Sequence, residues 1–149
     1  IQPRTLTELA FVCSLKYHEL PIIDPVKKYI VSDMTSILNE THGNIIYDEQ
    51  IMQLLLLAGF SITETIDCVR CIHGRQREKY MAYLSKFVAG YEKLGAKCED
   101  IIEFWNKIIS DGYYAVSKPH AVATAVLSYQ TAWLKYHYPK EFTDCFTTK

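Results

Sequence analysis

Apolar positions along the chain recur mostly at the spacing of an α-helix. In residues 61–74, for example, Ile62, Ile66 and Val69 return every three or four positions. Many such windows open on serine, threonine or aspartate and close on glycine, which are common helix start and stop signals. We therefore predict an all-α, multi-helix fold. At most one very short strand or hairpin is expected, at the apolar residues 44–47.

The predicted helices follow one another with short connections, and the chain shows no internal repeat or low-complexity segment. They are expected at residues 5–16, 33–41, 49–58, 61–74, 77–94, 99–110 and 119–136, with a short one after Pro139. On the helix at 119–136, small residues form one stripe and bulky residues form another. Tyr129 and Trp133 lie in the bulky stripe, so we expect them in the core, against the helices that begin at Glu49 and Arg77.

Length and composition suit one compact domain. The chain has 149 residues, of which 49% are hydrophobic, and this content can build a substantial core. The formal net charge of -1 means that phosphate binding would need a local cluster of Lys and Arg. Five cysteines, an odd and mostly scattered set, suit a reducing compartment, and no apolar run is long enough to cross a bilayer. We expect a cytoplasmic protein, and the start at Ile1 suggests a piece of a longer chain.

The stretch from Cys68 to His73 raises the possibility of a metal site. Cys68 and Cys71 share one flank of the predicted helix and could offer two thiolates. His73, however, lies about 200° around the helix from Cys71, and no second closely spaced pair supplies the other ligands of a structural zinc ion. We therefore expect both cysteines to pack as small apolar residues, and we predict no metal in this chain.

Two groups of basic residues are candidates for binding phosphate. In the first, Arg70 precedes the glycine that ends its helix, Gly74, and Arg75 follows it, so both guanidinium groups could approach one anion. In the second, Lys118 and His120 flank a proline at a helix start, where backbone N–H groups favour anions. Solvated side chains with only local contacts are the alternative for both groups.

Four segments then point to a known family. They are "IIYDEQIMQ", "AGFSITETIDCVRCIHGR", "SKFVAGYEKLG" and "SKPHAVATAVLSYQTAWLKYHYPKEF". In order and separation they resemble blocks of the bacterial C-family replicative DNA polymerases, the alpha subunit of DNA polymerase III. The most specific block runs from Leu127 to Pro139 and is similar to the family's "SYQTAWLKAHYP". The resemblance implies a segment leading from the palm into the fingers at residues 1–38 and a helical fingers subdomain at 39–149.

The resemblance also implies which residues bind the incoming nucleotide. Arg70, Gly74 and Arg75 match the first arginine, the glycine and the first lysine of the family's "LRRAMGKK". Lys118 and His120 match the lysine and histidine of its "NKSH", with Ser117 in place of the asparagine. His18 stands where the family's "LYRPGP" has arginine. Arg70, Arg75, Lys118 and His120 would then hold the dNTP phosphates, supported by Gly74, Ser117 and His18, and the departures from the motifs suggest a divergent phage- or prophage-type member.

The family implies further partners that act outside this chain. Its fingers close over the nascent base pair on primer–template DNA, and the Mg²⁺ ions of the reaction are held by carboxylates of the palm. The chain alone is therefore expected to be inactive, and contacts with a sliding clamp or other replisome subunits would use other regions. The competing hypothesis is a non-enzymatic helical module for protein–protein interaction, in which some of the eleven tyrosines form a docking surface.

Overall fold

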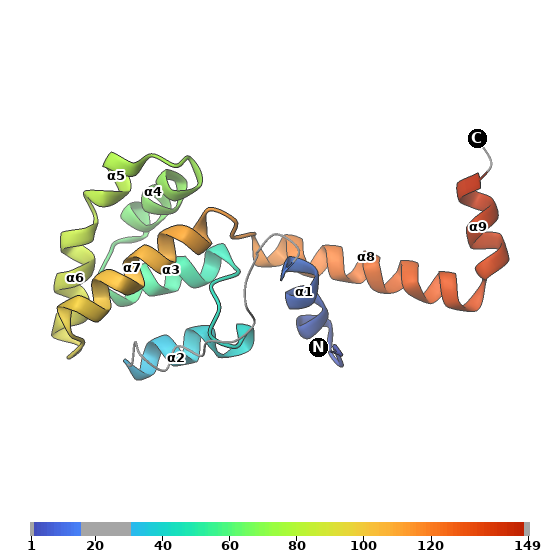
Figure 1. Ribbon diagram of the computed structural model, residues 1–149, viewed down its shortest axis with the longest axis horizontal. Coiled ribbons are helices and arrows are strands. Elements are labelled where there is room, and N and C mark those ends of the chain that lie inside the picture. The colour runs from blue at the N-terminus through green and yellow to red at the C-terminus, as the bar shows by residue number, and fades with distance from the viewer. Residues whose placement is uncertain (1, 16–30, 148–149) are drawn as a thin grey trace.

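The computed structural model describes residues 2–15 and 31–147, and within them the chain is built from helices (Figure 1). The α-helices are α1 (Leu6–Ser14), α2 (Ser32–Leu38), α3 (Asp48–Leu57), α4 (Ile62–His73), α5 (Arg77–Met81), α6 (Leu84–Lys93), α7 (Cys98–Gly112), α8 (Lys118–His137) and α9 (Pro139–Thr147), and the 3₁₀ turn η2 (Asn39–Thr41) continues α2. In these residues the only β-type pairing is an isolated parallel bridge between Tyr47 and Val116. The predicted all-α fold is confirmed.

Local capping signals set the starts of two helices. The Thr5 hydroxyl accepts a hydrogen bond from the backbone N–H of Glu8 at 3.2 Å and so caps α1. At α4 the Ser61 hydroxyl accepts from the N–H of Glu64, while a carboxylate oxygen of Glu64 accepts from the N–H of Ser61 at 2.8 Å. These bonds satisfy donors that the first helical turn leaves free. Both predicted starts are confirmed.

The prediction of one continuous helix over residues 77–94 is wrong. The structure divides it into α5 and α6, with Ala82 and Tyr83 between them. Tyr80, at the end of α5, bonds Tyr113 beyond α7, whereas the ring of Tyr83 packs on Phe60 with 5.7 Å between centroids. Because the helix is interrupted, Tyr80 and Tyr83 contact different parts of the fold although they are only three positions apart.

The larger core lies among α2, α3, α4, α6 and α7, with Tyr80 of α5 at its edge. Phe87 of α6 is fully buried, with its ring centroid 4.6 Å from that of Tyr91 and 4.8 Å from that of Trp105. The Tyr91 hydroxyl donates a hydrogen bond to the carbonyl of Leu54 at 2.9 Å, which joins α6 to α3. Burial of these large rings supplies much of the driving force for folding.

A glycine sets how closely α6 approaches α3. Gly90 lies against the backbone of Ala58, the residue that ends α3, and a Cβ atom on Gly90 would overlap the carbonyl of Ala58. The chain then turns at Gly59, whose φ of 84° falls in the left-handed region that glycine adopts readily. Only a residue without a side chain fits at position 90.

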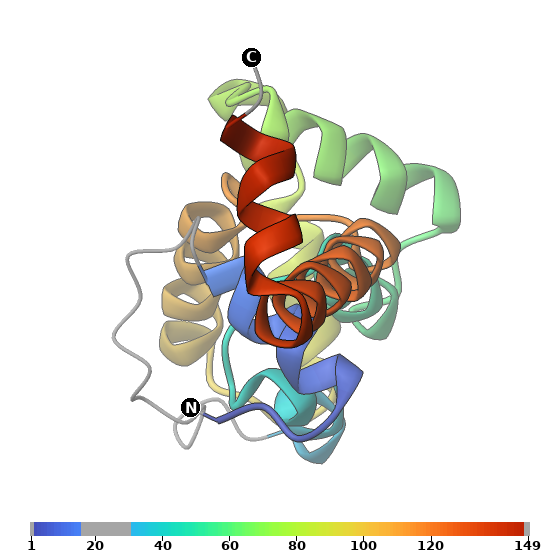
Figure 2. The ribbon, with the colours of Figure 1, turned by 90° about the vertical axis from the view of Figure 1, so that its right-hand side faces the viewer.

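A second, smaller core joins α1 to the first half of α8. Ala10 and Phe11 of α1 pack against Ala121 and Ala125 of α8, next to the buried Tyr47. The small residues of α8 thus allow a close approach, as the sequence predicts for this stripe. The far end of α8 extends away from the rest of the chain and leads into α9 (Figure 1), and α9 lies in front of the other helices in Figure 2.

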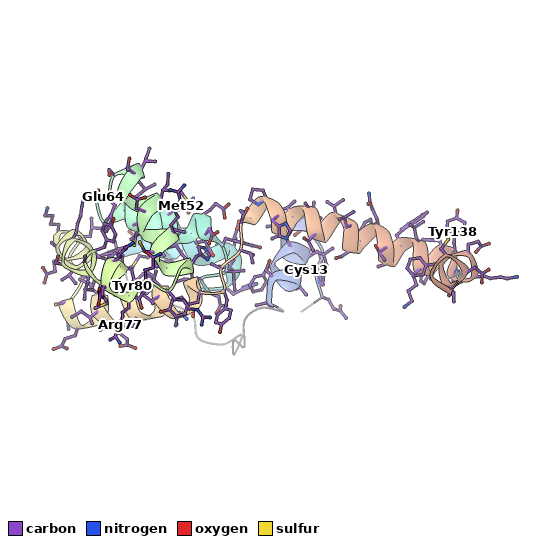
Figure 3. The ribbon with its side chains drawn as sticks, turned by 90° about the horizontal axis from the view of Figure 1, so that it is seen from above. Cys13, Met52, Glu64, Arg77, Tyr80 and Tyr138 are labelled. Atoms are coloured by element: carbon purple, nitrogen blue, oxygen red, sulfur yellow. The ribbon has the colours of Figure 1, made fainter. Side chains whose placement is uncertain are left out.

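The prediction that Tyr129 and Trp133 lie in the core is wrong. Tyr129 is 60% exposed and Trp133 is 43% exposed. The ring of Trp133 lies against the end of its own helix, 4.3 Å from that of His137. Figure 3 shows Tyr138, at this end of α8, far from Tyr80 on α5. The main contact of α1 is with Ala121 and Ala125, near the start of α8, and this contact leaves Tyr129 and Trp133 largely open to solvent.

The close contact at Gly90 predicts that Gly90→Ala destabilises the protein by roughly 1–3 kcal/mol, because the backbone of Ala58 cannot move aside as a flexible side chain would. Urea unfolding of the purified chain measures this change. Ala89→Ser, at an exposed position in the same helix, is the control and should unfold close to wild type. Equal midpoints for Gly90→Ala and wild type would show that the two helices are further apart.

The capping box at α4 predicts a defined pH dependence. The ammonium of Lys86, 2.6 Å from the Glu64 carboxylate, and the bonds from Ser61 lower the pKa of Glu64 from 4.5 to about 2. A carboxyl whose pKa is lower in the folded state stabilises the fold above its unfolded pKa, and this contribution is lost as the pH falls towards 2. Glu64→Gln should therefore be less stable than wild type at pH 7, and the difference should shrink between pH 4.5 and 2. Urea unfolding across this range checks the prediction, and a constant difference would contradict it.

Candidate phosphate-binding site

The end of α4, the start of α3 and the start of α8 meet on one side of the larger core. Nε2 of His73, the last residue of α4, lies 2.8 Å from Oδ1 of Asp48, the first residue of α3. The backbone N–H of Asp48 donates to the carbonyl of Val116 at 3.1 Å. This chain of contacts brings the segments that contain Arg75 and Lys118 close together, although they are far apart in the sequence.

Glu49 anchors the start of α8. One of its carboxylate oxygens accepts a hydrogen bond from the backbone N–H of Lys118 at 2.9 Å. Backbone N–H groups and the helix dipole favour a negative charge at this position. From the sequence, Asp48 and Glu49 are simply helix-start residues. The structure gives both a second function, which is to hold α4 and α8 against α3.

The side chain of Lys118 is engaged by acidic and aromatic neighbours. Its ammonium nitrogen lies 2.6 Å from a carboxylate oxygen of Glu40 and 5.9 Å from the centroid of the Tyr47 ring. Next to Glu40 in the chain, the hydroxyl of Thr41 accepts a hydrogen bond from the buried amide of Gln50 at 2.6 Å, which ties this segment to α3. Since the ammonium and the carboxylate are both partly exposed, an anion from solvent can compete for the ammonium.

Arg75 has an unusual backbone conformation. Its φ of 53° is left-handed, whereas Gly74 before it has a φ of -74°. The helix ends at Gly74 as expected, but the left-handed turn after it is made by Arg75. The Arg75 guanidinium lies over the ring of Tyr113, with Cζ 5.1 Å from the ring centroid, and the side chain stays exposed.

The other residues predicted to bind phosphate lie in different surroundings from one another. Arg70 is 77% exposed and lies 3.9 Å from Asp67, one turn earlier in α4. His120 lines a cavity of about 320 Å³ between α1 and α8, with Cys13 on its other wall. Ser117 is exposed and precedes α8 without a side-chain capping bond, and His18 lies outside the described residues. The structure thus brings Arg75 and Lys118 to neighbouring helix ends, with His120 on the α1 side.

The two cysteines of α4 differ in environment. Cys68 is fully buried in the larger core, and burial raises the pKa of its thiol to about 12. Cys71 is half-buried, with Sγ 3.9 Å from Oε1 of Gln76, and His73 contacts Asp48 instead. Within residues 2–15 and 31–147, no three side chains of His, Cys, Asp or Glu are grouped so that they could hold a metal ion.

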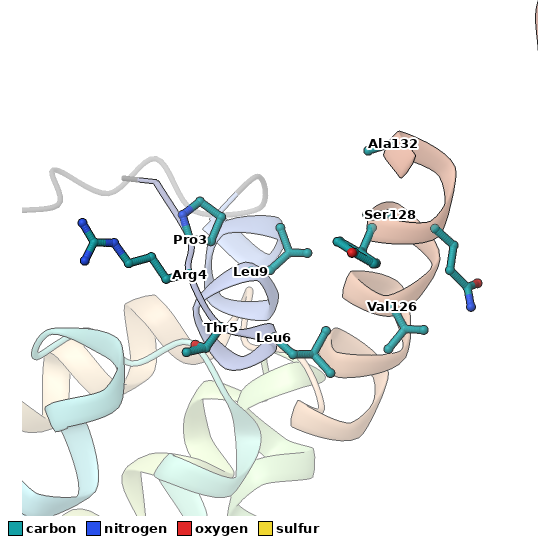
Figure 4. Close-up of a pocket in the computed structure, with 10 residues that line it drawn as sticks. Pro3, Arg4, Thr5, Leu6, Leu9, Val126, Ser128 and Ala132 are labelled. Carbon is teal, nitrogen blue, oxygen red and sulfur yellow. The ribbon is translucent and has the colours of Figure 1, made fainter. Parts of the chain in front are cut away.

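A larger cavity of about 800 Å³ lies between the first residues of the chain and the middle of α8. Leu6 and Leu9 point from α1 towards α8, near Val126, whereas Arg4 points away (Figure 4). The lining of this cavity is mostly apolar, so the cavity offers few groups that could bind a phosphate.

None of the helices in the described ranges combines the length and the apolar content that crossing a bilayer requires.

These features define a helical domain with basic side chains at two adjacent helix ends. Residues 1–95 match the family model described as the bacterial DNA polymerase III alpha subunit finger domain, and the chain belongs to this family. The resemblance seen in the sequence is thereby confirmed. The division at residues 38 and 39 stays a prediction, and so does the phage or prophage origin.

Several curated relatives are alpha subunits of DNA polymerase III. The chain is 34% identical over 128 residues to the one from Helicobacter pylori, a match that covers 85% of the chain and 10% of the relative. It is 37% identical over 115 residues to the one from Halalkalibacterium halodurans, covering 76% and 10%. For Thermotoga maritima the identity is 34% over 148 residues, covering 95% and 17%. The chain therefore spans 10% to 17% of the length of these relatives.

Glu49→Ala should destabilise the protein by about 0.5–2 kcal/mol, the range for losing a side-chain cap at a helix start. Gln53→Ala, at an exposed position in the same helix, is the matched control and should change stability little. The free energy of unfolding in urea measures both. If the two variants lose the same amount, Glu49 does not anchor α8.

Proposed function

We propose that this chain is the fingers part of a DNA-directed DNA polymerase, where it binds the triphosphate of the incoming dNTP and closes over the nascent base pair on primer–template DNA. Family membership supports the general assignment. The observation that supports a nucleotide site is the contact of α4 and α8 with the start of α3. Asp48 contacts His73 at the end of α4, and Glu49 accepts from the N–H of Lys118, so the segments with Arg75 and Lys118 are neighbours. Both side chains are long and partly or fully exposed, so they can turn towards one ligand.

The phosphate groups would replace an existing carboxylate. Glu40 neutralises Lys118 when no nucleotide is bound, and the pair lies at the surface, where an ion pair contributes little stability. A triphosphate carries more charge than one carboxylate and offers several oxygens to the ammonium. Arg75 adds a planar set of donors that suits two phosphate oxygens at once.

The role of these residues in the reaction is electrostatic. They hold the triphosphate so that the primer hydroxyl can attack the α-phosphorus, and they stabilise the charge that develops on the departing pyrophosphate. Arg70 and His120 would add further hydrogen-bond donors for the phosphate groups. As the family implies, Mg²⁺ is expected to be held by carboxylates of the palm.

One observation favours the second candidate, a helical module for protein–protein interaction. The far half of α8 exposes an apolar face that includes Tyr129, Trp133 and Leu134. Such a face is typical of a surface that another protein segment covers. This function does not require Arg75 or Lys118, so kinetics separate the two candidates.

In an intact alpha subunit that carries this chain as its fingers, Lys118→Ala and Arg75→Ala should each raise the KM for dNTP about tenfold. This corresponds to the lower end of the 1.5–3 kcal/mol for a charged hydrogen bond, because both groups are solvent-accessible. Affinity for primer–template should change much less. Glu40→Gln should have the opposite effect and lower the KM, because it frees Lys118.

Steady-state primer extension at varied dNTP concentration measures these effects. Lys93→Ala, which removes an exposed lysine from α6, is the control and should leave the KM unchanged. If Lys118→Ala and Arg75→Ala behave like Lys93→Ala, the nucleotide site is elsewhere and the interaction module becomes the better candidate.

A further inference from the structure

Arg75 occupies a backbone position that glycine usually fills. Its N–H donates to the carbonyl of Ile72 and the next N–H, of Gln76, donates to that of Cys71, both at 2.9 Å, a bonding pattern that ends many helices with a left-handed residue. Gly59 and Gly95 take the left-handed conformation after α3 and α6. At α4 an arginine takes it, although this conformation is less favourable for a residue with a Cβ atom.

The left-handed turn directs the Arg75 side chain to the segment that follows α7. There its guanidinium lies over the ring of Tyr113. A guanidinium stacked on an aromatic ring is held at its face and keeps its N–H donors at the edge, free for another partner. The arrangement restricts the arginine without using up the groups that would bind phosphate.

Tyr113 is in turn fixed from the core. Its hydroxyl lies 2.8 Å from that of Tyr80, and Tyr80 is only 5% exposed and belongs to the larger core. The buried Tyr80 thus contacts the half-buried Tyr113, and Tyr113 in turn contacts the exposed Arg75. This series links α5, the end of α7 and the turn after α4 at a single point.

We propose that Tyr113 is a positioning residue for Arg75, and that Tyr80 fixes the ring of Tyr113 for this purpose. This inference rests on the proposed function, in which Arg75 contacts the dNTP phosphates. Pre-ordering of the side chain lowers the entropy lost when the nucleotide binds. Removing the ring should therefore weaken nucleotide binding through Arg75, with little effect on the chemical step once the nucleotide is bound.

The test uses the intact alpha subunit with this chain as its fingers and measures KM and kcat for dNTP. Tyr113→Leu should raise the KM about two- to fivefold, as expected for the loss of an exposed cation–π contact, with a smaller change in kcat. Tyr113→Phe keeps the ring and should restore most of the affinity. Tyr80→Phe and Tyr113→Phe remove the same hydrogen bond and should have equal effects. Tyr136→Leu, which removes an exposed tyrosine from the far end of α8, should have no effect.

The decisive comparison repeats Tyr113→Leu in an Arg75→Ala background, where it should cause no further increase in KM. An equal increase in both backgrounds overturns the inference, because Tyr113 would then act independently of Arg75. If Tyr113→Leu does not fold, Tyr113→Met, which also lacks the ring, takes its place in the same comparison. If Arg75→Ala alone leaves the KM unchanged, the assignment of Arg75 to the nucleotide site fails. If Arg75→Ala raises the KM and the tyrosine variants do not, only the positioning role fails.

Discussion

The hydrogen bond between the Glu49 carboxylate and the backbone N–H of Lys118 connects the larger core to the helix that carries the smaller core. The larger core forms among α2, α3, α4, α6 and α7, and the smaller one joins α1 to α8. Glu49 lies in the first turn of α3 and so connects the start of α8 to the larger core. Because the contact pairs a negative charge with the positive end of a helix, it fixes the helix start as well as the lysine that begins it.

The proposed site follows from this arrangement. Basic groups at two helix ends are each restrained by a different kind of partner, an acidic side chain for Lys118 and an aromatic ring for Arg75. Both partners lie near the surface and leave the charges accessible. A site of this kind is ordered before its ligand arrives, yet it gives way to a more highly charged ligand at small cost.

The sequence is informative where the determining interactions are local. The starts of α1 and α4 depend on residues three positions apart, and both are predicted correctly. The contact between Glu49 and Lys118 joins residues 69 positions apart, and that between Tyr80 and Tyr113 joins residues 33 apart, so no local pattern reveals them. The family resemblance, in contrast, rests on long ordered segments and is confirmed. Periodicity places Trp133 on a bulky stripe but does not reveal whether another helix covers it, and in the structure Trp133 is 43% exposed.

Hydrogen exchange of the intact alpha subunit, with and without a saturating dNTP on a primer–template that lacks the primer hydroxyl, tests the central claim most directly. Exchange should be slower in peptides that cover residues 70–77 and 113–121, because the turn after α4 and the start of α8 would both contact the triphosphate. Peptides from residues 126–137 of α8 should exchange at the same rate in both states. Unchanged exchange in residues 70–77 and 113–121 while the nucleotide is bound would contradict the proposed site.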